Sequence, residues 1–206
     1  MQAESDKSES KDLRRSILDT ARHLLVSDGY ANLSMRKIAR AIGYSATSIY
    51  LHFEGKDALV HSLIDEGMGL KYEAFQAVVA AHPDDPVRRF DALCRAYIDF
   101  GLDNPEYYEI MYLLHPEQMA RFPAEKYRRA RRNLDVIVET LKEGAEKGLM
   151  SVTDAFVDAS VVWAALHGAV TLIFSRRMDR RVAQETFVDA MIGRLLHGYI
   201  TFSEHV

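Results

Sequence analysis

Two short segments with a helical spacing of apolar residues lie close together near the start of the chain. They cover residues 34–42 and 45–52, each opens on a serine, and Gly43 and Tyr44 separate them. A serine at the N-cap accepts a hydrogen bond from the first helical turn, and a glycine readily takes the left-handed conformation that ends a helix. The spacing therefore predicts two short helices joined by a tight turn, which is the sequence form of a helix-turn-helix.

Helical periodicity continues through most of the chain, and no segment alternates apolar and polar residues over the length of a strand. Further helices are predicted at about 13–28, 56–80, 87–103, 105–114, 123–147, 153–177 and 181–203. We therefore predict an all-α fold of about nine helices. Its parts are a disordered polar tail at 1–10, a three-helix helix-turn-helix domain at 11–57 and a larger helical domain at 58–206.

Size and composition limit the class of protein. The chain has 206 residues, 48% of them hydrophobic, which suits one or two packed domains. A single cysteine, Cys94, excludes a disulfide framework and fits a reducing compartment. No apolar run approaches the ~18 residues of a transmembrane helix, and the polar start lacks the apolar core of a secretory signal. We therefore expect a cytoplasmic protein with no membrane partner.

The net charge of the chain hides an asymmetry between its two parts. The whole chain carries −4, which taken alone speaks against a nucleic-acid partner. Residues 11–57, however, carry eight basic and five acidic side chains, whereas residues 58–206 are acidic overall. A basic head on an acidic body indicates a phosphate-bearing partner for the head.

The predicted second helix of the motif has the chemistry of a major-groove helix. Its small and hydrogen-bonding residues allow close approach to base edges, and Arg36 on the first helix can reach a guanine or a phosphate. The N-termini at Ser34 and Ser45 favour a phosphate, and Lys56 opens the next helix. The candidate DNA-binding residues are Ser34, Arg36, Ser45, Ala46, Thr47, Ser48, Tyr50, His52 and Lys56. For Tyr50 and His52, the alternative is ordinary packing at a helix end.

The stretch LSMRKIARAIGYSATSIYLHFEGKDALV at 33–60 resembles the DNA-binding signature of the TetR family of bacterial transcriptional regulators. The resemblance covers residues 11–60. It departs from the family pattern at Leu51, where a basic or polar residue is common, and at Ala46, which replaces a frequent proline or polar residue. It implies that Arg36, Ala46, Thr47 and Ser48 read bases. It implies that Ser34, Ser45, Tyr50, His52 and Lys56 contact phosphates.

The resemblance also implies a homodimeric, ligand-responsive regulator, most often a repressor, that binds a palindromic operator in double-stranded DNA. The last two predicted helices mix large apolar with small residues more than halfway round, which indicates burial on two sides. The predicted dimer interface is Trp163, Leu166, Val170, Phe174, Met191, Leu195 and Tyr199. The alternative is a single larger monomeric core.

Aromatic residues and methionines gather in the middle of the chain, which favours a largely apolar or aromatic small-molecule effector. The Trp163 to Gly168 stretch resembles a Trp-x-x-x-His-Gly pattern found in one group of TetR-type C-terminal domains. The predicted effector pocket is Tyr97, Phe100, Tyr108, Met111, Tyr112, Tyr127, Trp163 and His167. The alternative for each of these side chains is plain core packing. The arginines at 128, 129, 131 and 132 are read as a solvated face, with an anion site left open.

The sequence lacks the motifs of the enzyme classes that we considered. It contains no phosphate-binding Gly-x-x-x-x-Gly-Lys loop, no Gly-x-Gly-x-x-Gly and no His-Glu-x-x-His, and its eight histidines have no metal-ligand spacing. Cys94 lies on an apolar face and is read as a core thiol. We therefore expect no enzyme, no metal and no cofactor. The alternative function is a helical small-molecule-binding protein or enzyme without DNA-binding activity.

Overall fold

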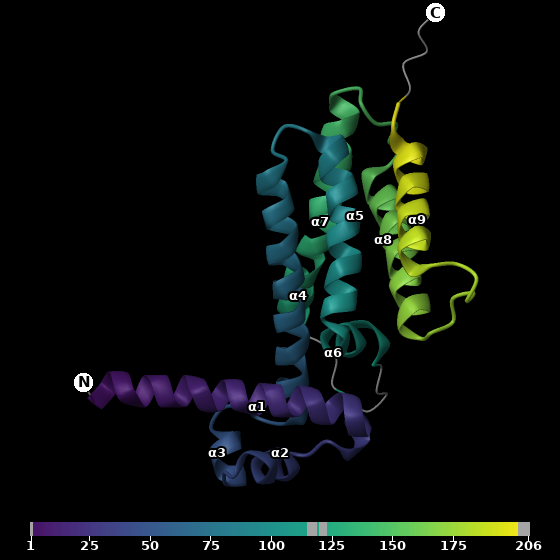
Figure 1. Ribbon diagram of the computed structural model, residues 1–206. Coiled ribbons are helices and arrows are strands. Elements are labelled where there is room, and N and C mark those ends of the chain that lie inside the picture. Colours follow the sequence, from purple (N-terminus) through teal and green to yellow (C-terminus); the bar gives the residue numbers. More distant parts are fainter. Residues whose placement is uncertain (1, 115–118, 120–122, 202–206) are drawn as a thin grey trace, which may run out of the picture. The chain divides into compact units, whose positions relative to one another are not determined.

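The computed structural model describes residues 2–114, 119 and 123–201 (Figure 1). Over these residues the chain forms nine α-helices, one π-helical turn and a single antiparallel bridge between Met150 and Ile200, which confirms the all-α prediction. The elements are α1 (Gln2–Asn32), α2 (Met35–Ile42), α3 (Ala46–Tyr50), α4 (Lys56–Ala81), α5 (Pro86–Asp103), α6 (Pro105–Tyr108), η1 (Glu109–Leu113), α7 (Ala124–Glu146), α8 (Ala155–Phe174) and α9 (Gln184–Tyr199).

The chain divides into two compact units. The first unit comprises residues 1–68 and 106–126, and the second comprises 69–105 and 127–206, so the division falls inside α4 at Met68 and Gly69. This differs from the expected division at residues 57 and 58. The segment that contains α6 and η1 also belongs to the first unit, together with the helix-turn-helix.

The first unit is built on α1, against which α2 packs, with α3 packed on α2 (Figure 1). Its core is formed by fully buried apolar side chains, among them Ile17, Leu18, Ala21, Ile38, Ile49 and Leu59. In the structure α1 already begins at Gln2, whereas the sequence predicted a disordered tail over 1–10. Good helix formers such as Gln, Ala, Glu and Lys in that tail allow the helix to extend. Near its other end α1 is kinked at the predicted stop, Gly29, which has a φ of 77°.

The α6–η1 segment joins the first unit through contacts with α1 and α4. Arg22 of α1 donates from Nε to Glu106 Oε2 at 2.8 Å and from Nη1 to the Tyr107 hydroxyl at 2.8 Å. Gly67 of α4 lies so close to η1 that an added Cβ would come within 2.5 Å of Met111 Sδ. These long-range contacts explain why the single helix predicted at 105–114 is instead a short α-helix followed by a π-helical turn. Such π-turns frequently mark functional segments.

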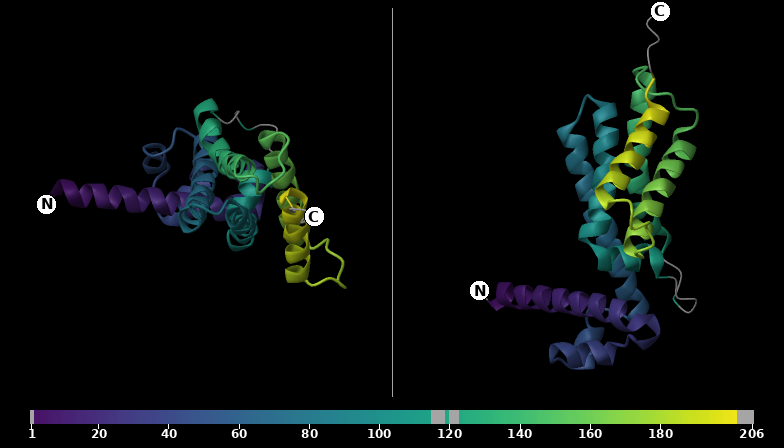
Figure 2. Two further views of the ribbon diagram at one scale, coloured as in Figure 1. Left: turned by 90° about the horizontal axis from the view of Figure 1, so that it is seen from above. Right: turned by 45° about the vertical axis from the view of Figure 1, so that its right-hand side comes forward.

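The second unit is centred on α5, which contacts both α8 and α9 (Figure 2). Phe90 and Tyr97 of α5 are buried, and the Phe90 ring meets the Tyr199 ring of α9 edge-on at 5.6 Å between centroids. The buried guanidinium of Arg89 donates to Glu143 of α7 at 2.7 Å and to the carbonyl oxygen of Pro83 at 2.8 Å. This arginine therefore fastens α7 and the loop before α5 together.

The two C-terminal helices are shorter than the sequence predicted. α8 ends at Phe174 rather than at 177, because Arg176 adopts a left-handed conformation with a φ of 55°. α9 ends at Tyr199, and residues 202 and 203 of the predicted helix lie outside the described residues. By length and composition alone, α8 is long and apolar enough to cross a membrane, although no such run was predicted from the sequence. One face of α8 is buried in the second unit through side chains such as Ala159 and Val162.

Candidate DNA-binding and effector sites

The helix-turn-helix has the caps that its sequence predicted. The Ser34 hydroxyl oxygen accepts a hydrogen bond from the Lys37 N–H at 3.2 Å, and the Ser45 hydroxyl oxygen accepts one from the Ser48 N–H at 3.1 Å. Between the two helices Gly43 takes a φ of 75°, in the left-handed region that glycine adopts without strain. Both serines are exposed, so the Ser34 hydroxyl proton can be donated to a phosphate. The Ser45 hydroxyl also lies 2.9 Å from the Ser48 hydroxyl, and either of these two can be the donor. That second role remains a prediction.

One face of α3 packs inward and the other is exposed. Ile49 is fully buried, whereas Thr47 and Tyr50 are exposed, with 54% of Tyr50 accessible. Ala46, Ser48 and His52 are half-buried. Arg36 projects from α2 as a further exposed side chain. The exposure of Tyr50 contradicts the alternative that it is a packed core residue, while His52 is compatible with either interpretation.

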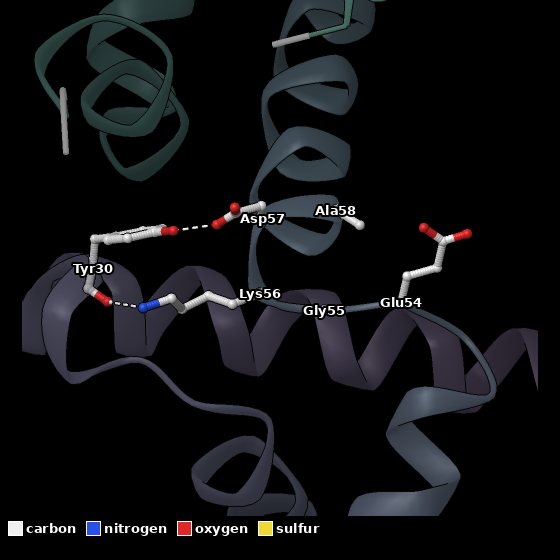
Figure 3. A pocket seen from close by; sticks show the side chains of 6 residues that line it. All are labelled: Tyr30, Glu54, Gly55, Lys56, Asp57 and Ala58. Atoms are coloured by element: carbon white, nitrogen blue, oxygen red, sulfur yellow. Dashed lines mark hydrogen bonds between the residues drawn. The ribbon is translucent and has the colours of Figure 1, made fainter. Parts of the chain in front are cut away.

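Lys56 has a structural role that the sequence analysis did not anticipate. Its Nζ donates to the backbone carbonyl of Tyr30 at 3.2 Å and lies 3.9 Å from the centroid of the Tyr30 ring (Figure 3). The Tyr30 hydroxyl in turn donates to Asp57, and burial together with this carboxylate raises the pKa of Tyr30 to about 12. The start of α4 is thus fastened to the end of α1. A phosphate contact by Lys56 would have to be made in addition to these bonds.

Two exposed side chains near the motif were missed by the sequence analysis. Arg40 lies one helical turn after Arg36 on α2, and both are exposed, so the two guanidinium groups share a face. Tyr44, in the turn between α2 and α3, is 48% exposed. The i, i+4 spacing of the arginines was a readable signal. By contrast, Lys37 is paired with Asp28 within the first unit.

Three of the predicted effector residues meet in the second unit. Trp163 of α8 donates from Nε1 to the Tyr97 hydroxyl at 3.1 Å, and its ring stacks on His167 with 5.6 Å between centroids. Lys71 of α4, which was not predicted to belong to this group, is buried with its Nζ 5.1 Å from the centroid of the Tyr97 ring. Burial lowers the pKa of Lys71 to about 7. Burial, and secondarily the charge of Lys71, lowers the pKa of His167.

A second aromatic group lies in the first unit. Tyr108 and Tyr112 are 5.0 Å apart between ring centroids, and the Tyr112 hydroxyl lies 4.0 Å from Met68 Sδ. Met111 is buried beside them in η1. The remaining two predicted effector residues lie in the second unit: Phe100 is buried in α5, and Tyr127 is 59% exposed. The exposure of Tyr127 does not agree with its predicted place in an enclosed pocket, because the basic, polar start of α7 leaves this ring at the surface.

The predicted dimer interface needs a correction. Leu166 and Val170 are completely buried inside their own protomer, so neither side chain can contact a partner. The prediction was wrong for these two residues because helical periodicity alone does not show which apolar face of α8 packs in the protomer's own core. The other predicted interface residues are partly exposed: Trp163, Phe174, Met191, Leu195 and Tyr199.

A different stripe of α8 is available to a partner. Val157, Val161 and Leu172 are 58%, 53% and 41% exposed, and helical spacing places them on one face together with Ala164 and Gly168. On α9, a shallow surface hollow is lined by Ala190, Gly193, Arg194, His197 and Gly198. Small residues of this kind allow two helices to approach closely.

The basic segment at the start of α7 is exposed at positions 128, 129, 131 and 132. Arg132 lies over the Tyr72 ring at 4.6 Å, at the edge of a hollow of about 290 Å³ that α4, α5 and α7 line. Over the part of the chain that the structure describes, no three His, Cys, Asp or Glu side chains are grouped to hold a metal ion.

Both parts of the chain match known protein families. Residues 17–63 match the bacterial regulatory proteins of the tetR family, and residues 90–195 match the tetracyclin repressor-like C-terminal domain. The chain belongs to the TetR family of bacterial transcriptional regulators. TetR regulators are soluble DNA-binding proteins and generally not enzymes. The family therefore accounts for both the helix-turn-helix and the larger helical part.

Individual relatives of this TetR regulator are distant in sequence. The uncharacterised HTH-type transcriptional regulator YobS of Bacillus subtilis is 22% identical over 167 residues, or 81% of this chain and 82% of that protein. A protein of unknown function from Rhodococcus sp. RHA1 has a similar structure, with a TM-score of 0.79 and 27% identity over 92% of this chain and 96% of that one. AibR, solved in complex with isovaleryl coenzyme A and operator DNA, gives a TM-score of 0.68 and 27% identity over 89% and 97% of the two chains.

Proposed function

We propose that this TetR regulator is a homodimeric repressor that binds a palindromic operator through α2 and α3 and is released by a small-molecule effector. The observation that carries the proposal is the surface formed by Arg36, Thr47 and Tyr50. All three side chains are exposed on a pair of serine-capped helices whose other face is core. Such a helix can enter the major groove without unfolding any part of the head.

The exposed face of α8 supports the dimer. Val157, Val161 and Leu172 form an apolar stripe on a helix of which only part is buried in the protomer. A two-fold partner that packs its own α8 and α9 on this stripe and on the small residues of α9 would remove it from water. Two-fold symmetry in the protein calls for a matching palindrome in the DNA, with half-sites about 34–36 Å or a multiple apart.

The first unit supports a route from effector to DNA. It contains α2 and α3, and also Met111 and Tyr112 of the predicted effector residues. A ligand that contacts the α6–η1 segment therefore acts on the same compact unit that binds the operator. If the ligand prefers a conformation that does not fit DNA, it shifts the population and releases the operator. By linkage, DNA must weaken the effector by the same factor.

The remaining expectations complete the proposal. The aromatic side chains of both units favour an effector with a large apolar or aromatic part. AibR, the structural relative solved with isovaleryl coenzyme A and operator DNA, provides a precedent for such an arrangement. We propose that the protein is located in the cytoplasm. We also propose that it is not an enzyme, needs no cofactor and has no membrane partner.

Footprinting on the DNA upstream of the protein's own gene tests this function. The proposal expects protection of a palindrome at nanomolar protein concentration, with two protomers bound per site. Binding to this DNA no tighter than to unrelated DNA, even at low salt, would overturn the proposal. Ligand binding without any specific DNA retention would instead favour the alternative, a helical small-molecule-binding protein without DNA-binding activity.

A further inference from the structure

A buried lysine lies among the aromatic residues of the second unit. Lys71 of α4 is 3% exposed, and its Nζ lies 5.1 Å from the centroid of the Tyr97 ring of α5. Tyr97 accepts the indole N–H of Trp163, whose ring stacks on His167 of α8. We call these four side chains, Lys71, Tyr97, Trp163 and His167, the lysine cluster. Three helices contribute to it, so its geometry is fixed by the packing of the unit.

The lysine cluster carries at most one positive charge at neutral pH. Burial lowers the pKa of Lys71 to about 7, because the ammonium is removed from water. The pKa of His167 is lowered by burial and secondarily by the charge of Lys71, which favours the neutral imidazole. Tyr97 and Trp163 contribute polar hydrogens but no charge. A ligand bound here therefore meets a single cation in a site of low polarity.

The same cluster presents flat apolar surfaces. Trp163 is 36% exposed and His167 is half-buried, so the stacked rings are reachable from the surface of the protomer. An ammonium beside aromatic faces suits a ligand with an anionic head and an apolar body.

We propose that the lysine cluster is an effector site and that the effector is an apolar monocarboxylic acid. Its carboxylate pairs with the Lys71 ammonium, and its hydrocarbon part lies against Trp163 and His167. This inference rests on the proposed function, because it names the chemical class of the effector. A phosphate monoester or a dicarboxylate would bring a second negative charge that one ammonium cannot compensate in a site with little water. A neutral alcohol of the same shape gains nothing from the cation.

Trp163 provides the measurement, because it is the only tryptophan in the chain. The wild-type protein is titrated with hexanoate, octanoate, cyclohexanecarboxylate and phenylacetate, and separately with the alcohol that corresponds to each acid, while Trp163 emission is followed. The titrations are run at about pH 6, below the pKa of Lys71 and above that of the acids. We expect at least one acid to saturate the signal with an affinity about tenfold or more above that of its alcohol, which corresponds to about 1.4 kcal/mol.

Lys71→Met keeps the length of the side chain and removes its charge. It should abolish the preference for the acid while leaving the affinity for the alcohol unchanged. The matched control is Lys142→Met, which removes an exposed lysine of α7 in the same unit. Equal affinity of acids and alcohols for the wild type would overturn the proposal, and this comparison does not depend on any variant. Retention of the acid preference in Lys71→Met, or no response to any acid up to about 10 mM, would also overturn it.

Operator retention separates this inference from the proposed function. The active acid should release wild-type protein and Lys142→Met from the operator but leave Lys71→Met bound. If Trp163 reports acid binding while the wild type shows no specific DNA binding, the function proposed above fails and the carboxylate site stands. If the wild type binds its operator and no acid binds, the proposed regulatory function is upheld and the proposed carboxylate site is wrong.

Discussion

Arg22 of α1 holds Glu106 of α6 by a hydrogen bond of 2.8 Å between Nε and Oε2, although 84 positions separate the two residues. The same guanidinium bonds to Tyr107, and its carbon lies 4.7 Å from the centroid of that ring. Because α1 also carries α2, this ion pair connects the α6–η1 segment to the helix-turn-helix within one compact unit. It is therefore a place where the response to an effector can be changed without touching DNA.

A double-mutant cycle on Arg22→Ala and Glu106→Ala measures this connection. The two side chains are 23% and 34% exposed, so we expect a coupling of about 0.5–1 kcal/mol in the free energy of unfolding. Operator affinity should change little, whereas the effector concentration needed for release should shift. The exposed pair Lys142 and Glu139 of α7 serves as control and should couple by less. A coupling between Arg22 and Glu106 no larger than in the control would contradict the assignment.

Replacing Gly67 or Gly69 of α4 by alanine should change the free energy of unfolding differently. Gly67→Ala places a Cβ within 2.5 Å of Met111 Sδ, so the Met111 side chain, which is buried, has to shift. An added Cβ on Gly69 meets nothing within 4 Å. In thermal unfolding we expect Gly69→Ala to stabilise the protein by up to about 1 kcal/mol through helix propensity, and Gly67→Ala to lose that gain or more. Equal stabilisation by both substitutions would show that the close approach of α4 and η1 is absent.

The two faces of α8 are distinguished by Val161 and Leu166. Val161→Asp introduces a charge on the exposed stripe and should give a folded monomer in sedimentation experiments. Leu166→Ala creates a cavity in a fully buried position and should lower the free energy of unfolding by about 2–5 kcal/mol. The expected contrast is one variant that changes the oligomeric state and another that changes stability. A Val161→Asp protein that remains dimeric would exclude this stripe as the interface.

Acid should weaken the bond between Arg89 and Glu143. Hydrogen bonds from Arg89 and then from Lys147 lower the pKa of Glu143 to about 2. Because the folded-state pKa lies below the unfolded value of about 4.3, the carboxylate contributes stability above about pH 4.3 that is lost as the pH falls toward 2.

Denaturant unfolding of Glu143→Gln over a pH series checks the sign. Near neutral pH we expect the variant to be less stable than the wild type by about 1.5–3 kcal/mol, the range for a hydrogen bond to a charged group. The difference should shrink toward pH 2. Glu139→Gln, on the same helix but more exposed, should show little difference at any pH. A constant difference between Glu143→Gln and the wild type would contradict the pKa assignment.

The local structure of the head was predictable from sequence because its signals are local. Ser34, Gly43 and Ser45 act within one helical turn, and each is where the caps and the turn are found. The composition of the first unit was not predictable in this way. It depends on contacts such as Arg22 with Glu106, and nothing in the neighbourhood of either residue indicates its partner.

Which residues of the second unit are buried could not be predicted from the sequence either. Leu166 and Val161 are both apolar residues of one helix, and only the positions of α5 and α9 decide which of them is core. Lys71 follows an exposed leucine in a mixed helix, where a lysine ordinarily faces water. Lys71 is buried beside Tyr97 because α4 and α5 pack together, and this packing cannot be read from the sequence around the lysine.

DNA binding by α2 and α3 is tested most directly by the operator affinity of the double variant Arg36→Ala/Tyr50→Ala, measured by fluorescence anisotropy on the footprinted DNA. Both side chains are exposed, so circular dichroism should show an unchanged fold. The matched control is Arg88→Ala/Tyr127→Ala, which removes an exposed arginine and an exposed tyrosine from the second unit. We expect a loss of about 100-fold or more in operator affinity for the first protein, about 2.7 kcal/mol, and none for the control. Wild-type affinity in the first protein, or an equal loss in both, would contradict the claim that α2 and α3 bind DNA.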